Sequence, residues 1–401
     1  MYSVKKITQD MYWVGVNDRK IALFENVYPV KNGVSYNSYL VLDDKTILMD
    51  TVDSVASIQF FENIEHVLAG RKLDYLVVNH MEPDHCACIG EIVKRYPEVK
   101  IVGNFKTFVM ISQFFDFDIE SRKVVIKEGD TLNTGRHTFA FAMAPMVHWP
   151  EAMVTYDTVD KVLYSADAFG TFGALSGNIF ADETEFETRW ADEARRYFTN
   201  IVGKYGVQVQ ALLKKASALD IQYICPLHGP VWRKNIDWIV NKYNLWSTYT
   251  PEENSVLIVY GSVHGHTENA AEILSNLLAE REVSNIMLVN ASTAHFSDVI
   301  ANAFKYSHIV FASATYNMSI FPPMQVVLHE IAEHNLQNRT IALIENGTWT
   351  PATVNLMTEA LSKLKNNVIL DKKVTIKSAL NDKSYEDLTQ LADIIAQDLK
   401  K

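Results

Sequence analysis

The sequence predicts an α/β protein with two domains, and three observations support this fold class. Residues 1–250 contain many short apolar runs separated by Gly, Asn, Asp and Pro, which is typical of β-strands with helices between them. Residues 251–401 alternate regularly between apolar β-branched runs and amphipathic helical segments, the pattern of a doubly wound parallel sheet. Between them, the polar segment STYTPEENS contains a proline and precedes an abrupt strand. We therefore place the domain boundary after residue 250.

The N-terminal domain is predicted to contain a series of strands and one long helix. The runs VSYNSYLVLD (34–43) and KTILMDTV (45–52) are interpreted as paired strands. A helix is predicted over 183–205, because this segment has a helical period with acidic residues early and basic residues late, as the helix dipole favours. Further strands are predicted at 73–80, 100–105, 123–132, 137–145, 153–158 and 161–167.

The C-terminal domain is predicted to alternate strand and helix throughout. Its strands are expected at 256–262, 285–291, 308–314, 340–346 and 372–380. Its helices are expected at 266–278, 295–304, 322–334, 352–364 and 385–399. Regular alternation over this length favours a parallel sheet whose helices cover both faces.

The composition excludes several classes of protein. A formal net charge of −11 argues against nonspecific binding to nucleic acid or to an anionic membrane, because both need clustered Lys and Arg. No apolar run approaches the ~18 residues that a membrane helix needs, and the start MYSVKKITQDMYWVG lacks the apolar core of a signal peptide. Three cysteines are too few for a disulfide framework. We therefore expect a cytoplasmic protein with neither a nucleic-acid nor a membrane partner.

One short stretch concentrates side chains that bind metals. HMEPDHCAC follows the apolar run YLVV and places two histidines and two carboxylates within six positions. Three isolated donors elsewhere also follow apolar runs, in the segments PMVHWP, VLYSAD and CPLHGP. Such donors converge when loops at strand ends fold around an ion. The predicted metal ligands are His80, Glu82, Asp84, His85, His148, Asp167 and His228.

Other residues of these types are interpreted as structural. A single histidine after a strand is usually a surface or capping residue. The histidines without a comparable setting are His66, His137, His295, His308, His329 and His334. Cys86 and Cys88 are interpreted as compact side chains that pack behind the loop rather than as ligands.

The acidic character of the donor set bears on the choice of metal. A carboxylate is a harder and more electron-donating ligand than imidazole, so three carboxylates with four histidines favour a redox-active iron pair. Zinc has no redox chemistry, so it gains nothing when carboxylates take the place of imidazole ligands. The residues therefore predict a site for two iron ions.

The metal motif resembles that of the metallo-β-lactamase-like αββα sandwich, whose zinc hydrolases commonly carry H-x-H-x-D-H. Here Glu82 takes the place of the second histidine, and H-x-E-x-D on this fold is similar to the motif of the flavodiiron proteins. The resemblance covers essentially the whole chain. It implies that one iron is held by His80, Glu82 and His148, and the other by Asp84, His85 and His228, with Asp167 bridging the two. In some relatives the histidine that matches His85 turns away, so its ligation stays open.

The resemblance also implies a role for Tyr197 in the segment ARRYFTN. It is similar to a tyrosine of the family that can hydrogen-bond an oxygen species bound at the metal site, which would make it catalytic. The alternative is an ordinary half-buried tyrosine.

A second motif, VLIVYGSVHGHTENAAEIL, places a loop of small and hydroxylic residues between a strand and a helix. The backbone amides of this loop and the helix N-terminus are expected to bind a phosphate. The loop resembles the flavodoxin loop that binds the phosphate of FMN, and His264 and His266 depart from the usual residues. The loop residues are Ser262, Val263, His264, Gly265, His266 and Thr267.

Two later loops, SATYNMSIFPP and ENGTWTPA, also follow predicted strands and resemble the other flavin loops of a flavodoxin-like domain. Trp349 is expected to stack on the flavin ring, with packing under a turn as the alternative. The residues predicted to contact FMN in these loops are Ala314, Thr315, Tyr316, Asn317, Asn346, Gly347, Thr348 and Trp349.

The family resemblance implies reduction of dioxygen to water, with reduction of nitric oxide to nitrous oxide as a second reaction of the same centre, for detoxification in an anaerobe or microaerophile. It implies a homodimer or a dimer of dimers, because the flavin and iron sites of one chain are too far apart. No Cys-x-x-Cys pair follows the last predicted helix. We therefore expect a separate electron donor, such as a rubredoxin or a reduced deazaflavin.

Two other functions remain open at this level. One is primary nitric oxide reduction at the same site. The other, less favoured by the acidic ligand set, is a zinc hydrolase with an FMN domain. An electron carrier or sensor with a vestigial metal site is disfavoured because all seven candidate ligands are chemically intact.

Overall fold

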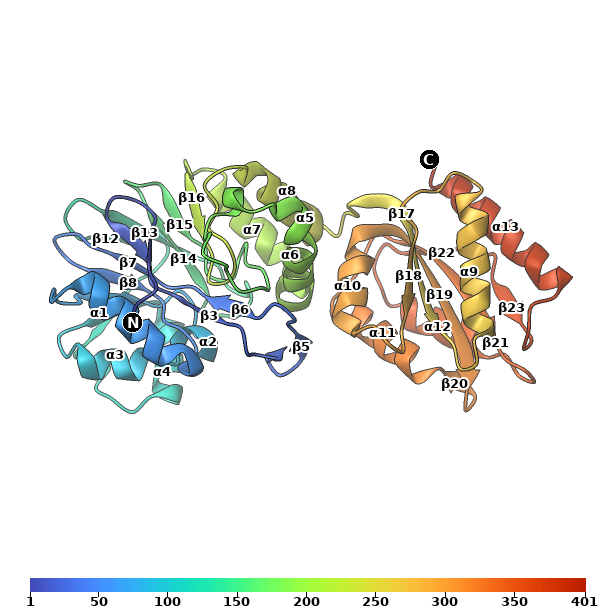
Figure 1. Cartoon of the computed structure of the whole chain (residues 1–401), viewed down its shortest axis with the longest axis horizontal. Coiled ribbons are helices and arrows are strands. Elements are labelled where there is room, and N and C mark those ends of the chain that lie inside the picture. Colours follow the sequence, from blue (N-terminus) through green and yellow to red (C-terminus); the bar gives the residue numbers. More distant parts are fainter. The chain divides into compact units, whose positions relative to one another are not determined.

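A computed structural model describes all 401 residues, which fold into two compact units, residues 1–244 and 245–401 (Figure 1). The boundary predicted after residue 250 lies slightly further along the chain than this division. Hydrogen bonds explain the difference. Trp246 donates its indole N–H to Glu252, at 2.7 Å, and the buried Arg339 donates to the carbonyl of Tyr249, at 2.6 Å. These contacts attach the connecting segment to the C-terminal unit.

The N-terminal unit contains two main sheets. The first has the order β1-β2-β7-β8-β9-β10-β11, with strands Lys5–Lys6, Met11–Trp13, Tyr39–Val41, Ile47–Met49, Tyr75–Val77, Lys100–Gly103 and Lys123–Val125. The second has the order β12 to β16, with strands Thr131–Asn133, Thr138–Met143, Met153–Asp157, Val162–Tyr164 and Tyr223–Cys225. Two small ribbons pair β3 (Val16–Asp18) with β6 (Val34–Tyr36) and β4 (Leu23–Phe24) with β5 (Tyr28–Pro29).

The two main sheets share one apolar core. Tyr39, Met49 and Val77 of the first sheet lie in the same buried cluster as Phe139 and Tyr164 of the second. Strands β8 to β11 are parallel, so their connecting helices lie on the face that the second sheet does not cover. These helices are α1 (Ser57–Leu68), α2 (Pro83–Cys86), α3 (Ile89–Arg95) and α4 (Phe105–Phe114). Helices α5 (Phe186–Arg189), α6 (Ala191–Tyr197), α7 (Gly206–Ala216) and α8 (Ile236–Ser247) follow β15 or β16. The predicted αββα sandwich is confirmed.

Two predicted elements of this unit are divided in the structure. Residues 34–43 form two strands, β6 and β7, because the buried Asn37 between them donates its side-chain amide to the carbonyls of Pro226 and Gly229. The helix predicted over 183–205 is divided into α5, α6 and a π-helical segment, Phe198–Val202. Directly after Tyr197, the hydrogen bonds of a π-helix, between residues five apart, replace those of an α-helix, between residues four apart. The periodicity of the sequence cannot show this change.

The C-terminal unit is a doubly wound sheet with the order β18-β17-β19-β21-β22, and β23 also pairs with β21. Its strands are β17 (Glu253–Gly261), β18 (Met287–Asn290), β19 (Tyr306–Tyr316), β21 (Thr340–Asn346), β22 (Val368–Ile369) and β23 (Val374–Ile376), with a short β20 (Ser319–Ile320) antiparallel to β19. All pairings among the six strands other than β20 are parallel. This is the flavodoxin-like order 2-1-3-4-5, so the predicted fold is confirmed.

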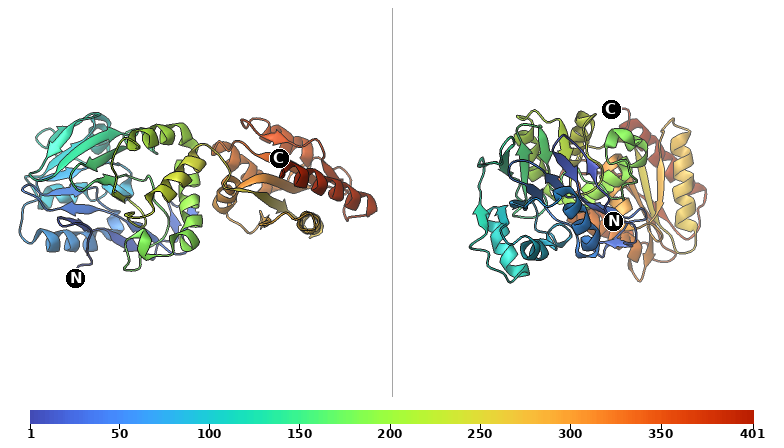
Figure 2. Two further views of the ribbon diagram at one scale, coloured as in Figure 1. Left: turned by 90° about the horizontal axis from the view of Figure 1, so that it is seen from above. Right: turned by 60° about the vertical axis from the view of Figure 1, so that its left-hand side comes forward.

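Helices cover both faces of this sheet (Figure 2). One buried cluster contains residues of α9 (His266–Ala279) and α13 (Asp382–Asp398). The opposite cluster contains residues of α10 (Phe296–Lys305), α11 (Pro322–Glu333) and α12 (Thr353–Leu361). In neither unit is there a helix with the length and apolar character required to cross a bilayer.

A buried histidine joins the two sheets of the N-terminal unit at one end. His137, which is fully buried, lies 2.7 Å from Asp157 through Nδ1 and 3.3 Å from Asp10 through Nε2. Arg136 pairs with Asp160 at 2.6 Å. Burial lowers the pKa of His137, but the hydrogen bond and charge of Asp157 outweigh burial and raise it above its ordinary value.

This pKa shift predicts a pH-dependent contribution to stability. Because the folded-state pKa of His137 is raised, its stabilisation is complete below the unfolded-state pKa near 6.5 and is lost as the pH rises through the folded-state pKa. We expect the urea midpoint of the wild type to fall more between pH 6 and pH 9 than that of His137→Asn. Equal pH dependence in both proteins would contradict this role. His329→Asn, on the surface of α11, serves as the control.

Candidate metal centre and ligand cavity

The ends of β8 and β9 position the first donors. Asp50, directly after β8, accepts hydrogen bonds from the backbone N–H groups of Asn79 and His80, at 2.7 and 3.2 Å. These contacts fix the backbone where the chain leaves β9. The chain then enters α2, which begins at Pro83. Proline suits the first position of a helix, because the backbone N–H that it lacks would have no partner within the helix. This short helix carries Asp84 and His85, which are buried.

The second sheet supplies the other three donors from its own strand ends. His148 lies in the loop between β13 and β14. Asp167 and His228 follow β15 and β16, which are parallel neighbours, so both side chains emerge at the same edge. The backbone N–H of Leu227 donates to the carbonyl of Ala166, at 3.0 Å, which joins these two loops.

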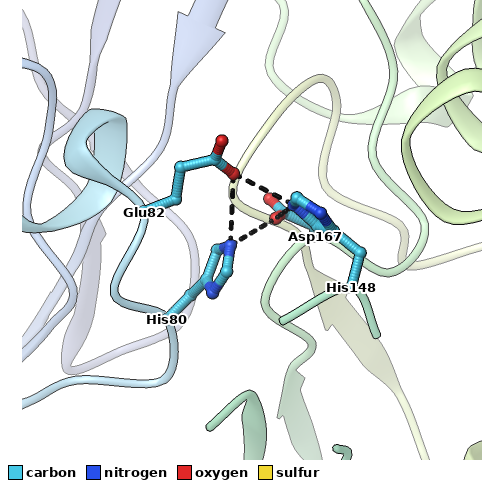
Figure 3. Close-up of side chains that lie close together, drawn as sticks. All are labelled: His80, Glu82, His148 and Asp167. Carbon is cyan, nitrogen blue, oxygen red and sulfur yellow. Dashed lines mark hydrogen bonds and ion pairs between the residues drawn. The ribbon is translucent and has the colours of Figure 1, made fainter. Parts of the chain in front are cut away.

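The first donor group consists of His80, Glu82, His148 and Asp167 (Figure 3). Nε2 of His80 lies 3.3 Å from Glu82 Oε2 and 3.1 Å from Asp167 Oδ2. Nε2 of His148 lies 3.0 Å from the same Glu82 oxygen and 3.2 Å from the same Asp167 oxygen. Four side chains from three loops therefore direct one atom each at a common point.

The second donor group consists of Asp84, His85 and His228. Nε2 of His85 lies 3.3 Å from Asp84 Oδ2, and Nε2 of His228 lies 3.2 Å from the same oxygen. The remaining oxygen of Asp167, Oδ1, lies 3.3 Å from His85 Nε2 and 3.7 Å from His228 Nε2. Asp167 thus faces the first group with one oxygen and the second group with the other.

The hydrogen bonding of these side chains fits a pair of cations. Both carboxylate oxygens of Asp84 and Oδ1 of Asp167 are buried and have no hydrogen-bond partner, which is costly for a carboxylate. Nε2 of His85 and Nε2 of His228 lie only 3.0 Å apart. A metal ion bound at each group would satisfy these atoms, and mixed imidazole and carboxylate donors suit iron.

Electrostatics links metal binding to proton release. Burial lowers the pKa of His80, but the charge of Asp167 and the hydrogen bonds to Asp167, Glu151 and Glu82 outweigh it and raise this pKa well above its usual range. The same balance raises the pKa of His148 to about 9. Burial raises the pKa of Asp167, but the surrounding histidines hold it well below its ordinary value. The carboxylates therefore keep protons on the imidazoles, and metal ions would displace those protons.

Two of the four histidines have a partner that fixes the ring orientation. Nδ1 of His80 lies 2.9 Å from Glu151 Oε1, and Nδ1 of His228 donates to the carbonyl of Ser35, at 2.7 Å. His85 differs, because its Nδ1 is buried with no hydrogen-bond partner. Its Nε2 nevertheless points into the second donor group. The structure thus brings His85 to the site but supplies no hydrogen bond to its Nδ1 that would fix the ring.

We predict that Glu151→Gln weakens metal binding through His80. Glu151 also accepts the backbone N–H of Met81, at 2.8 Å, so its carboxylate fixes both the ring and the loop. Loss of such an outer contact typically costs about 10–100-fold in metal affinity, and we expect that range in a competition titration with an iron chelator. Glu128→Gln, an exposed change, should leave the affinity unaltered. An unchanged affinity in Glu151→Gln would contradict the positioning role.

Tyr197 lies close to the predicted metal ligands. Its side chain is fully buried, and its ring centroid is 5.5 Å from that of His228. A methyl group on Gly170 would lie 3.0 Å from Tyr197 Cε1, so this glycine makes room for the phenol ring. The alternative of a half-buried tyrosine does not describe this position, and its catalytic role stays a prediction. Cys86 and Cys88 are buried and lie in neither donor group.

An open hollow of about 1160 Å³ leads to the carboxylates of Glu82 and Asp84, and Glu25 and Asn26 also line it. Glu25 was not predicted from the sequence. The residue is exposed, but its carboxyl group lies against that of Glu82. Burial and this neighbouring carboxylate raise the pKa of Glu25 to about 8. Glu25 lies in the β4–β5 turn, where no apolar strand end or donor motif indicated its position.

The C-terminal unit contains a separate cavity of about 570 Å³. It is lined by thirteen of the fourteen predicted flavin contacts, and Gly265 provides the turn before α9 instead. Three further residues, Met318, Thr350 and Ser378, line it and were not predicted. Trp349 is 83% exposed and therefore is not packed under a turn. Its flat side chain is free to cover a ligand ring.

The backbone of this cavity fits a phosphorylated ligand. Gly265 adopts a left-handed conformation with φ of +87°, and its N–H donates to Ser262 Oγ at 3.0 Å. This turn leaves the N-terminus of α9, a 14-residue helix, facing the loop. At Gly347 a side chain would lie 2.8 Å from Pro351 Cα, so only glycine fits this tight loop. The size of the cavity is within the range for small-molecule sites.

Comparisons with known proteins place the chain among relatives with this architecture. Residues 34–229 match the family described as ODP family beta lactamase. The chain is 30% identical over 354 residues to the anaerobic nitric oxide reductase flavorubredoxin of Aliivibrio fischeri, a match that covers 87% of this chain and 71% of that protein. The rubredoxin oxygen:oxidoreductase of the anaerobe Desulfovibrio gigas superposes with a TM-score of 0.92 at 27% identity, over 99% of both chains.

A mutant of the flavodiiron protein of Thermotoga maritima has the same fold, with a TM-score of 0.89 at 24% identity over 99% of this chain and 98% of that one. The predicted resemblance is thereby confirmed over the whole length. Members of this family carry a diiron site and FMN, and the two donor groups and the loop-lined cavity fit those cofactors. The chain belongs to the flavodiiron protein family of oxidoreductases.

Proposed function

We propose that this protein reduces dioxygen to water at a diiron site, with electrons supplied through FMN in the C-terminal cavity. One observation carries the proposal: the two oxygens of Asp167 face two separate donor groups, in a chain that also contains the loop-lined cavity of the C-terminal unit, which we name the flavin cavity after its proposed ligand. When bound, the two irons supply a redox-active site for a small oxygen-containing molecule, and the flavin supplies electrons.

The donor set suits a pair of divalent ions. His80, Glu82 and His148 would hold one iron, and Asp84, His85 and His228 the other, with Asp167 shared. The three carboxylates contribute three negative charges, which nearly balance two divalent ions without leaving a large net charge buried. The histidines contribute neutral donors once their protons are displaced.

The surrounding residues leave one side of the proposed metal site open to a substrate. The open hollow reaches Glu82 and Asp84 from solvent, while Tyr197 closes the buried side beside His228. We propose that the Tyr197 hydroxyl donates a hydrogen bond to the bound substrate. Burial and the nearby charge of Asp167 raise the pKa of Tyr197 well above its usual value, so the phenol keeps its proton.

Reduction of nitric oxide to nitrous oxide is the second candidate. It is supported by the similarity to a flavorubredoxin described as an anaerobic nitric oxide reductase, whereas dioxygen is supported by the similarity to a rubredoxin oxygen:oxidoreductase. Dioxygen needs four electrons per molecule and nitric oxide needs one. The same site can serve both.

The proposal is tested by measuring the consumption of dioxygen and of nitric oxide side by side, with iron-replete enzyme and reduced rubredoxin. We expect rapid consumption of dioxygen without accumulation of hydrogen peroxide, and slower consumption of nitric oxide. Faster consumption of nitric oxide would favour the second candidate. Failure to consume either gas, although the protein holds iron and FMN, would contradict the proposed function.

We propose a rubredoxin as the electron donor and a homodimer as the assembly. A reduced deazaflavin is the alternative donor. Exposed apolar side chains border both cavities, with Val55 72% exposed beside the metal hollow and Met318 56% exposed beside the flavin cavity. Burial of such side chains favours association. Light scattering coupled to size-exclusion chromatography should give the mass of two chains or of four.

A further inference from the structure

The flavin cavity is almost free of charged side chains. Sixteen residues line it, and none of them is Asp, Glu, Lys or Arg. Its lining is otherwise made of hydroxyl, amide and apolar side chains and one phenol, that of Tyr316. The only lining residues that can carry a positive charge are His264 and His266, and both belong to the loop before α9.

The charged groups on the surrounding elements either pair with other residues or lie outside the cavity. Glu268 of α9 accepts a hydrogen bond from Tyr260 Oη, at 2.7 Å. Glu345 at the end of β21 accepts the backbone N–H of Val354 and the hydroxyl of Thr375, each at 2.9 Å. Lys377 after β23 is exposed and does not line the cavity.

FMN, the proposed ligand of this cavity, carries a phosphate with a charge of about −1.5 to −2 near pH 7. The N–H groups of the loop and the helix N-terminus offer partial positive charge only. His264 and His266 flank Gly265, and both are exposed in the absence of a ligand. Their side chains line the same cavity, so either one is able to approach a phosphate bound in the loop.

We infer that His264 and His266 are cationic ligands of the flavin phosphate, so that FMN binding by this chain is coupled to proton uptake. The inference rests on the proposed binding of FMN in this cavity. A nearby phosphate dianion favours the protonated imidazole, because opposite charges stabilise each other. Binding therefore takes up protons, and dissociation releases them.

The direction of the pH dependence follows from this linkage. An imidazole that is protonated in the complex and neutral in the free protein makes binding tighter at low pH and weaker at high pH. Histidine ordinarily changes charge between pH 5 and 8. The second ionisation of the phosphate, near pH 6, acts in the opposite direction but is largely complete above pH 7. The affinity for FMN should therefore fall as the pH rises from 7 to 9.

The test is a fluorescence titration of the full-length protein, freed of flavin, with FMN and with riboflavin at pH 7, 8 and 9. One linked proton weakens binding by at most about tenfold per pH unit. We expect the dissociation constant for FMN to rise about tenfold or more from pH 7 to 9. The constant for riboflavin, which lacks the phosphate, should change by less than about twofold.

Variants separate the imidazoles from the backbone of the loop. The double variant His264→Asn/His266→Asn should bind FMN weakly and with little pH dependence, while riboflavin binding is unchanged. The double variant His264→Lys/His266→Lys should bind FMN tightly even at pH 9, because lysine keeps its charge. His329→Asn, which removes an exposed histidine of the same unit outside the cavity, should behave as the wild type.

The outcomes distinguish a failure of the inference about the imidazoles from a failure of the proposed flavin site. If FMN binds the wild type equally well at pH 7 and pH 9, or if the asparagine double variant keeps the wild-type pH dependence, the inference about the imidazoles is wrong and FMN binding stands. If neither FMN nor riboflavin binds at any pH, the proposed flavin site itself is wrong.

Discussion

Replacement of Asp167 by asparagine is expected to remove at least one of the two irons and to lower gas consumption by more than about 100-fold. The change preserves the size of this buried side chain but removes the charge, and an amide offers only one oxygen to two donor groups. Loss of a residue that only hydrogen-bonds to a metal ligand typically costs about 10–100-fold in metal affinity. Loss of a ligand that two metal ions share should therefore cost more. Iron content and turnover are measured on the same preparation.

A matched substitution shows whether this effect is specific. Asp182→Asn removes a largely buried carboxylate of the same unit that pairs with Arg233 and belongs to neither donor group. It should retain two irons and at least half of the activity. Equal iron content in Asp167→Asn and in the wild type would show that Asp167 is not a ligand.

The second large effect is expected for Glu82→His, which changes the donor set to the H-x-H-x-D-H pattern of zinc hydrolases. Glu82 Oε2 lies 3.3 Å from His80 Nε2 and 3.0 Å from His148 Nε2. Removing this charge leaves two carboxylates for two metals, and imidazole suits zinc. We expect protein produced with both metals available to contain mainly zinc, and to lose more than about 100-fold of its activity, because zinc has no redox chemistry.

The control is Glu98→His, which replaces a surface glutamate paired with Lys72 and leaves the donor groups intact. It should contain iron like the wild type. If Glu82→His still contained two irons and kept full activity, the carboxylate at this position would not determine the choice of metal.

The regular part of the fold was predictable from the sequence because each element has a strong local signal. In the C-terminal unit the strand predicted at 340–346 and the helix predicted at 322–334 agree with β21 (Thr340–Asn346) and α11 (Pro322–Glu333). In the N-terminal unit, tertiary contacts override the local pattern. Asn37 divides one apolar run between two sheets by hydrogen-bonding to a distant loop, and no local pattern reports a contact of that kind.

The candidate site likewise contains residues that could be predicted from the sequence and residues that could not. The seven predicted donors follow apolar strands, so their positions at one edge of the sandwich could be expected, and their metal ligation stays a prediction. The groups that support them could not be predicted. Ser35 holds His228 with a backbone carbonyl, which every residue has, and Glu25 reaches Glu82 from a hairpin turn. Ser378 lines the proposed flavin cavity from the segment after β23, outside the three expected loops.

The most direct test of the central proposal is Mössbauer spectroscopy of the oxidised protein loaded with ⁵⁷Fe. Two ferric ions that share the carboxylate of Asp167 should be magnetically coupled, so the spectrum should show two iron ions per chain with no net magnetic moment at low temperature. A spectrum of single, uncoupled ferric ions, or a protein that retains zinc and rejects iron, would contradict the proposal that these seven side chains hold a pair of irons.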